Sequence, residues 1–214
     1  MASNCLRTHN EFLWQHFQNA ESLTNFQLDQ FQQYCSLLIE WNKHINLTAI
    51  TSVADIITYH FQDSISLGHA CDLSTIQSCA DVGTGAGFPG LALAIRYPHI
   101  NVSLIEVTQK KIRFLSCVTQ RLGLTNVNIV PLDWLTIVRT CTLKTDIVCA
   151  RASLQPIDLI TMFDTTSCLR KGLLIYWASQ TWQPLPELKK FMSHDFTYTV
   201  GEKTRKLIFF KTKS

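Results

Sequence analysis

A glycine-rich loop with an acidic residue at its start is the first feature of this sequence that could do chemistry. Residues 81–90 read DVGTGAGFPG, so Gly83, Gly85 and Gly87 alternate along the loop and Asp81 stands in front of them. Glycine allows positive φ angles and lets the backbone approach a ligand closely. In open α/β sheets, ligands lie at the carboxyl ends of the strands, near turns of this kind. The loop therefore predicts a site for a nucleotide-like cofactor.

Two cofactor classes are compatible with the loop. Gly85-x-Gly87-x-x-Gly90 formally matches the dinucleotide fingerprint, but this frame is displaced from the strand end and includes Pro89. The glycines that directly follow the strand read G-x-G-x-G instead. The carboxylate of Asp81 can accept the ammonium group of S-adenosylmethionine, directly or through water, whereas it would repel a pyrophosphate. These details and a closing antiparallel hairpin favour S-adenosylmethionine, with a dinucleotide or a purely structural turn as alternatives.

Further acidic residues follow the next two predicted strands. Glu106 ends the second strand and suits the two ribose hydroxyls of a nucleoside. Asp133 follows the third strand, in PLDWL, where an adenine amino group is expected. Trp134 and Leu135 come next and are candidates for lining the adenine face. Because these residues follow successive strands in order, we expect them to line one nucleoside site.

The fourth predicted strand is followed by CARAS, residues 149–153, which carries no recognisable proton-transfer group. Enzymes that methylate exocyclic amines have an Asn- or Asp-Pro-Pro-aromatic turn there, which this chain lacks. Cys149 lacks the preceding proline of cytosine-C5 enzymes and is expected to be a buried thiol. An acceptor that is already nucleophilic, such as guanine N7, needs no general base. The sequence thus predicts residues that align the nitrogen, the methyl carbon and the sulfur.

The elements that position these residues change character along the chain. Helical periodicity covers residues 26–42 and 52–70, so the first 70 residues look all-helical. Strands that alternate with helices are predicted at 76–82, 101–106, 127–132, 146–150 and 172–178, and the last hairpin pairs FTYTV with KLIFFKT. We expect an α/β fold: a Rossmann-like class I S-adenosylmethionine-dependent methyltransferase sheet with a closing antiparallel hairpin and an N-terminal helical extension. The extension (1–72) and the methyltransferase domain (73–214) are expected to form one compact unit.

The composition and the spacing of particular residues argue against membrane, exported and metal-binding proteins. No run reaches the roughly 18 apolar residues that a membrane span needs, and the first residues lack the pattern of an export signal. The eight cysteines form no C-x-x-C pair or His/Cys cluster, which predicts reduced thiols in a cytosolic protein and no metal. His60 and Asp63 could share a helix face, where a structural role is expected. Residues 170–214 carry nine basic and three acidic side chains, which indicates either a solvated surface or a polyanion partner.

Several motifs together resemble one known family. They are WNKHINLTAI (41–50), HFQDS (60–64), DVGTGAGFPG (81–90), ARAS with Arg151, and GEKTRKLIFFK with Arg205. From about residue 24 to 211, the chain is similar to the ribosomal RNA small subunit methyltransferase G family, also called the glucose-inhibited division protein B family. The resemblance implies a cytoplasmic bacterial enzyme that methylates guanine N7 in 16S ribosomal RNA, or in the small-subunit particle, near the decoding region. We expect a monomer.

The resemblance also implies roles for particular residues. Gly83 and Phe88 would contact the cofactor, as would Trp134 and Leu135. Arg151 would lie beside both cofactor and substrate and is the candidate catalytic residue, because its charged fork can hold a carboxylate, a phosphate or a guanine edge.

The chain departs from the family after the fifth strand. The family usually has Leu-Lys-Gly there, whereas this chain reads YWASQ (176–180), and the Arg-x-Glu expected after the third strand is replaced by residues 133–135. Other basic side chains are then candidates for contacting RNA: Lys110, Lys111, Arg113, Lys203, Arg205 and Lys206. Phe88, Trp177 and Trp182 are candidates for stacking on a base, with core packing favoured for Trp177. The alternatives are methylation of a protein or small molecule and a non-catalytic ribosome-binding role.

Overall fold

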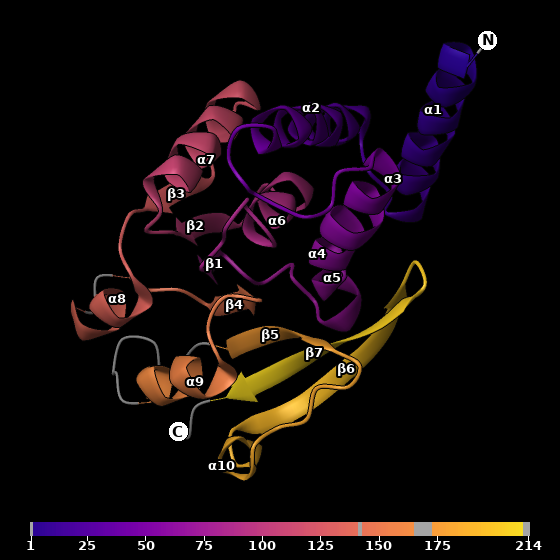
Figure 1. Cartoon of the computed structure of the whole chain (residues 1–214). Helices are drawn as coiled ribbons and strands as arrows, with labels where there is room; N and C mark the ends of the chain where they lie inside the picture. The colour runs from indigo at the N-terminus through magenta and orange to yellow at the C-terminus, as the bar shows by residue number, and fades with distance from the viewer. Residues whose placement is uncertain (1, 141–142, 165–172, 212–214) are drawn as a thin grey trace.

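A mixed sheet forms the centre of the protein (Figure 1). The computed structural model describes residues 2–140, 143–164 and 173–211. Its strands are β1 (Ser78–Val82), β2 (Asn101–Ile105), β3 (Val127–Val130), β4 (Ile147–Arg151), β5 (Leu173–Ser179), β6 (Met192–Val200) and β7 (Lys203–Lys211). The spatial order is β3-β2-β1-β4-β5-β7-β6, with β1 to β5 parallel and β7 antiparallel to both of its neighbours. The predicted parallel sheet and closing hairpin are confirmed.

The strand order reverses between β1 and β4. From β1 the chain first builds outward through β2 to β3, and then returns to place β4 on the other side of β1. A reversal of this kind leaves a crevice at the carboxyl ends of the two central strands, which is the usual ligand position in open α/β sheets. The glycine-rich loop follows β1 and therefore lies at this crevice.

Helices cover both faces of the sheet (Figure 1). One face carries α2 (Asn25–Asn42), α6 (Gly90–Arg96) and α7 (Gln109–Arg121), and the other carries α8 (Trp134–Thr140), α9 (Pro156–Asp164) and α10 (Pro186–Lys189). Each face has its own hydrophobic core. Burial on both sides explains why the central strands read as short apolar runs such as LLIYW.

The N-terminal helices share a core with the sheet. Helix α1 (Ala2–Ala20) precedes α2, and the side chain of Thr24 caps α2 in a reciprocal pair of hydrogen bonds with Gln27. Phe31 and Phe61 pack with ring centroids 4.9 Å apart, in the same core as residues of α6, α7 and β4. The helical extension therefore packs directly on the sheet.

The helical region predicted over about 52–70 is confirmed, but it is divided into four segments. It consists of α3 (Val53–Ile56), the π-helix η1 (Ile57–Gln62), α4 (Asp63–Ile65) and α5 (Leu67–Ala70). A π-helical segment widens the turn, so the side chains around it no longer follow the usual 3.6-residue spacing, and such segments are frequent at functional sites. Apolar periodicity alone could not show this change.

Other elements also differ from their predicted extents. Helix α8 was not predicted, and the hairpin strands begin earlier than FTYTV and KLIFFKT, so only Gly201 and Glu202 separate them. The segment PIDLITMFDTTSCL (156–169), whose sequence predicts a helix, is helical from Pro156 to Asp164, and its remaining residues lie outside the described ranges. Within the described ranges, no helix combines the length and the apolar character needed to cross a membrane.

Candidate active site

The glycine-rich loop has the positive φ angles that its sequence predicts. Gly83 has φ +65°, and a Cβ added there would lie 2.5 Å from the Cβ of Ser153. At Gly85, φ is +60° and the space around a Cβ is open, while its N–H donates to Glu106 Oε2 at 3.2 Å. A Cβ on Gly87 would meet Leu91 at 2.4 Å. The loop therefore packs against the protein at some glycines and leaves open space at others.

A first cavity of about 290 Å³ opens beside this loop, at the carboxyl ends of β1 to β4. Its lining consists of Val82, Gly83, Ile105, Glu106, Val107, Lys111, Leu132, Asp133, Trp134, Ala152, Ser153 and Leu154. Four of the residues predicted to bind the cofactor are among them. The lining does not include Asp81, Gly85, Gly87, Phe88, Leu135 or Arg151.

Asp81 is fully buried under the loop. Its Oδ2 accepts hydrogen bonds from Thr84 Oγ1 at 2.6 Å and from the Gly90 N–H at 2.7 Å. Burial raises the pKa of Asp81 to about 6, although these hydrogen bonds favour the charged form. Its Oδ1 is buried without a partner in the described part of the chain. An unpaired buried carboxylate oxygen is costly, so this atom fits a positively charged group or an ordered water.

Glu106 joins the second strand end to the glycine loop. Its Oε1 accepts hydrogen bonds from the N–H groups of Val107 and Thr108, and its Oε2 accepts from Gly85 and lies 3.7 Å from Lys111 Nζ. Each carboxylate oxygen can accept more than one bond, so Glu106 retains acceptor capacity towards the cavity. Lys111, for which contact with RNA stays a prediction, contributes to this cavity wall.

Asp133 has a structural role in addition to its place in the cavity. Its two carboxylate oxygens accept hydrogen bonds from the N–H and hydroxyl of Thr136, which caps the start of α8 and lowers the pKa of Asp133. Trp134 follows, almost fully buried, with no hydrogen-bond partner for its Nε1 in the described structure. Trp134 supplies the aromatic surface of the cavity.

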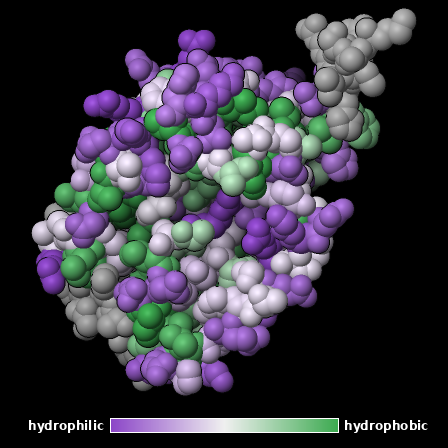
Figure 2. All heavy atoms as spheres, in the orientation of Figure 1, coloured by the Kyte–Doolittle hydropathy of each residue, from purple (hydrophilic) through white to green (hydrophobic). Residues whose placement is uncertain are grey.

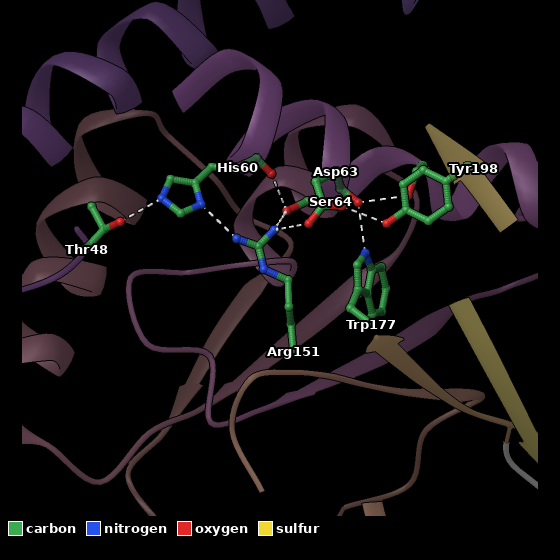
Figure 3. A network of polar contacts seen from close by, with 8 residues as sticks. Thr48, His60, Asp63, Ser64, Arg151, Trp177 and Tyr198 are labelled. Carbon is green, nitrogen blue, oxygen red and sulfur yellow. Dashed lines mark hydrogen bonds and ion pairs between the residues drawn. The ribbon is translucent and has the colours of Figure 1, made fainter. Parts of the chain in front are cut away.

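Arg151 ends β4 and lies at the centre of a polar network (Figure 3). Its NH1 donates to Asp63 Oδ2 at 2.9 Å and to Ser64 Oγ at 3.2 Å, and its NH2 lies 2.7 Å from His60 Nδ1. The guanidinium also stands 5.4 Å from the ring centroid of Phe88. The π-helical segment and the residues that follow it therefore hold the side chain of the predicted catalytic arginine.

The tautomer of His60 follows from this geometry. Arginine is only a donor, so His60 Nδ1 accepts, and Nε2–H donates to Thr48 Oγ1 at 2.8 Å. Burial and the charge of Arg151 lower the pKa of His60 to about 3, which keeps the ring neutral. The motifs around Thr48 and His60 thus converge on one guanidinium, although the sequence pointed only to a shared helix face for His60 and Asp63.

Asp63 is paired on both sides. While Oδ2 accepts from Arg151, Oδ1 accepts from the hydroxyl of Tyr198 at 2.7 Å, and the Asp63 backbone carbonyl accepts from Trp177 Nε1 at 2.8 Å (Figure 3). Trp177 is buried, as expected for a core residue. The hairpin strand β6 and the strand β5 are thereby tied to the N-terminal helices.

We expect Tyr198→Phe to lower the free energy of unfolding by about 1.5–3 kcal/mol, because a hydrogen bond to a buried charged group is lost. Urea denaturation of the two proteins measures this difference. Tyr176→Phe makes the same chemical change on strand β5 of the same sheet and serves as the control. An unchanged midpoint for Tyr198→Phe would contradict a stabilising bond to Asp63.

A second cavity, of about 360 Å³, lies on the other side of the β4 end. Its lining consists of Ile50, Tyr59, Asp63, Arg151, Ala152, Tyr176, Trp177, Ala178, Ser179, Trp182 and Arg205. Ala152 lines both cavities and has φ +51°, a conformation that is strained for a residue with a Cβ and common at ligand sites. In the space-filling view, hydrophilic side chains reach into a hollow near the middle of the molecule (Figure 2).

The remaining basic candidates lie on two elements. Lys110 and Arg113 are exposed on α7, and Lys203 and Lys206 lie on β7 with Arg205. Lys203 Nζ stands 4.1 Å from the ring centroid of Tyr59, which lines the second cavity. Their contact with RNA stays a prediction.

Comparison with known proteins identifies the family. A sequence model described as "GidB: rRNA small subunit methyltransferase G" matches residues 27–197. Proteins named ribosomal RNA small subunit methyltransferase G are 48% identical over 106 residues in Lachnoclostridium phytofermentans and 50% identical over 109 residues in Dehalococcoides mccartyi. These alignments cover 50% and 51% of this chain and 44% and 46% of the relatives, so the chain spans about half the length of the curated relatives it matches.

Solved structures support the fold. The putative methyltransferase yhhF from Escherichia coli superposes with a TM-score of 0.54 at 15% identity, over 71% of this chain and 85% of that one. At this identity the likeness concerns the fold alone. Because the family model covers most of the sequence, including the glycine loop, both strand-end acidic residues and Arg151, the chain belongs to the rRNA small subunit methyltransferase G family.

Proposed function

We propose that this protein transfers a methyl group from S-adenosylmethionine to N7 of a guanine in 16S ribosomal RNA, near the decoding region, in the bacterial cytoplasm. The observation that carries this proposal is the family match over residues 27–197, which includes the whole lining of the first cavity. The residues of that cavity and of the Arg151 network give it a physical basis.

The first cavity fits the cofactor. S-adenosylmethionine supplies an electrophilic methyl group on a positively charged sulfur. Its ammonium group would be neutralised by the unpaired Oδ1 of Asp81, through a water where direct contact is blocked. Glu106 would hold the ribose hydroxyls, and Trp134 would lie against the adenine. The volume of about 290 Å³ lies just below the usual range of small-molecule sites, which begins at about 300 Å³.

The polar groups beside the cavity favour an acceptor that has no proton to remove. Both ring nitrogens of His60 are engaged, and the carboxylate of Asp63, only 4% exposed, is held in an ion pair by Arg151. A general base must be within reach of the proton that it removes, and the buried, paired carboxylate of Asp63 is not. Guanine N7 already has a lone pair, so alignment and exclusion of water are sufficient for its methylation.

The test is a transfer assay with labelled S-adenosylmethionine and 16S ribosomal RNA, free or as the small-subunit particle, from a bacterial strain that lacks this methyltransferase. We expect incorporation at one guanine, and sensitivity of that position to borohydride and aniline identifies N7-methylation. RNA from the parent strain, which already carries the modification, is the control and should accept little label. Cofactor binding without incorporation into either RNA would refute the proposal.

Gly83→Ala is expected to weaken binding of S-adenosylhomocysteine, measured by isothermal titration, by at least about tenfold. A Cβ at this position would clash with Ser153 at the cavity wall. Gly123→Ala is a matched control, because Gly123 has nearly the same φ, +63°, with nothing within 4 Å of the added Cβ. Both variants place an alanine at a positive φ angle and carry the same backbone strain. A difference in affinity between them therefore measures the effect of the added Cβ on the first cavity. Equal affinities would show that the ligand binds elsewhere.

A different acceptor is the alternative, since the YWASQ segment carries no lysine. Salt dependence separates the two: binding of RNA weakens steeply with salt because phosphate contacts release counterions, whereas binding of an uncharged acceptor does not.

A further inference from the structure

The second cavity combines aromatic surface with excess positive charge. Its walls include the rings of Tyr59, Tyr176 and Trp182 and the guanidinium groups of Arg151 and Arg205. Among the described residues, Asp63 is the only carboxylate in its lining, and it is already paired with Arg151 and Tyr198. Within the described part of the chain, the positive charge of Arg205 is therefore left without a counterion in the cavity.

Arg205 has an unmet hydrogen-bonding requirement. Its Nε is buried and has no partner in the parts of the chain that the structure describes. Burial lowers the pKa of Arg151 below its usual value, and the nearby charge of Arg205 acts in the same direction. Two guanidinium groups held close together favour an anion between or beside them, and the arginine fork suits a phosphate in particular.

Arg205 supplies a positive charge at the end of β5, where the lysine of the family is missing. Ser179 ends β5, and its register partner on the antiparallel strand β7 is Arg205. The neighbouring strand β7 thus presents a cation at the end of β5, where the segment YWASQ (176–180) itself carries no basic residue. The charge comes from the closing hairpin instead of from β5 itself.

The ring pair at the other wall suits a base. Tyr176 and Trp182 have centroids 6.0 Å apart, both are half-buried, and both line the cavity. Aromatic side chains that keep an accessible face stack on nucleobases, each worth about 1–3 kcal/mol. A volume of about 360 Å³ suits one nucleotide taken out of its stack and excludes a helix of RNA.

We propose that the second cavity holds the acceptor nucleotide, with its phosphate on Arg205 and its base against Tyr176 and Trp182. The base then faces the first cavity across Ala152, which lines both. This inference rests on the proposed methyl transfer to RNA and adds where the nucleotide binds and which residue holds its phosphate. Arg205 is thus a substrate-binding residue, distinct from the Arg151 that the N-terminal helices hold.

The first experiment compares Arg205→Gln and Arg205→Lys with Lys211→Gln, which removes a charge from the exposed far end of the same strand. Arg205→Gln is expected to lower kcat/KM for RNA by about tenfold or more and to reduce the salt slope of RNA binding by about one. Arg205→Lys should retain part of the activity. Affinity for S-adenosylhomocysteine should stay within about twofold in all three, which shows that the fold is intact. Unchanged kcat/KM and salt slope in Arg205→Gln would overturn the inference.

A second experiment is independent of methyl transfer. Guanosine 5′-monophosphate and guanosine are titrated against the protein, and the indole N–H resonance of Trp182 is followed by NMR, with Trp182→Phe used for its assignment. The monophosphate should bind more tightly than the nucleoside, and Arg205→Gln should remove the difference. Equal binding of both compounds would refute the phosphate site. Nucleotide binding at Arg205 without transfer to any RNA would refute the proposed function, and with it the acceptor role, but not the phosphate site. Transfer with the same kcat/KM in Arg205→Gln would refute only this inference.

Discussion

Arg151→Met is expected to lower the free energy of unfolding by about 3–5 kcal/mol, because it leaves the buried carboxylate of Asp63 without its cation. Only 4% of the Asp63 side chain is exposed, so water cannot replace the guanidinium. The same change removes the hydrogen bonds to Ser64 and His60. Urea denaturation followed by circular dichroism measures the loss.

The paired variant Arg151→Met with Asp63→Asn is the control for this explanation. An amide at position 63 has no charge to compensate and can still accept from the hydroxyl of Tyr198. We therefore expect the paired variant to be more stable than Arg151→Met alone. The single variant Asp63→Asn completes the comparison. If the losses of stability in Arg151→Met and Asp63→Asn simply add in the paired variant, the ion pair does not govern stability, and lost packing against Phe88 is the better explanation.

His60 and Asp81 are expected to oppose each other in acid. The pKa of His60 is about 3 in the folded protein, against about 6.5 in an unfolded chain, so the unfolded state binds more protons between these values. Stability from His60 is therefore lost as the pH falls below about 6.5, with a slope of up to about 1.4 kcal/mol per pH unit. The pKa of Asp81 is raised to about 6, so the folded state binds the extra proton there and gains stability between about pH 6 and 4.

Difference curves separate the two groups. The unfolding free energy of the protein minus that of His60→Gln should rise with pH between about 4 and 6.5 and be flat above about 7. The same difference taken with Asp81→Asn should fall as the pH rises from about 4 to 6. Urea denaturation at half-unit pH steps provides both curves, and groups common to each pair cancel. A difference curve that is flat over the whole pH range would show that the replaced group does not titrate as its burial predicts.

The parts of the fold that sequence reasoning reached depend on local pattern. Alternation of apolar strands and amphipathic helices gave the sheet and its hairpin, and the glycine loop located the crevice. Glu106, Asp133 and Trp134 were placed in one cavity because parallel strands all end at the same edge of the sheet.

The hydrogen-bond network around Arg151 could not be predicted from local sequence pattern. His60 and Asp63 lie 91 and 88 residues before their arginine, and Tyr198 lies 135 residues after Asp63. Periodicity cannot show that such distant side chains meet. Helix α8 was missed for a related reason: Asp133 was interpreted only as a ligand-binding residue, although it also caps the helix.

The shared guanidinium has an evolutionary consequence. Hydrogen bonds link Arg151 to Asp63 and His60, and these two residues to Tyr198 and Thr48, so replacing one residue leaves a partner unsatisfied. A single replacement is therefore costly, whereas a replacement accompanied by a matching change in its partner is tolerated. Among relatives of this chain, these positions should drift together, as coordinated pairs, while the neighbouring surface changes freely.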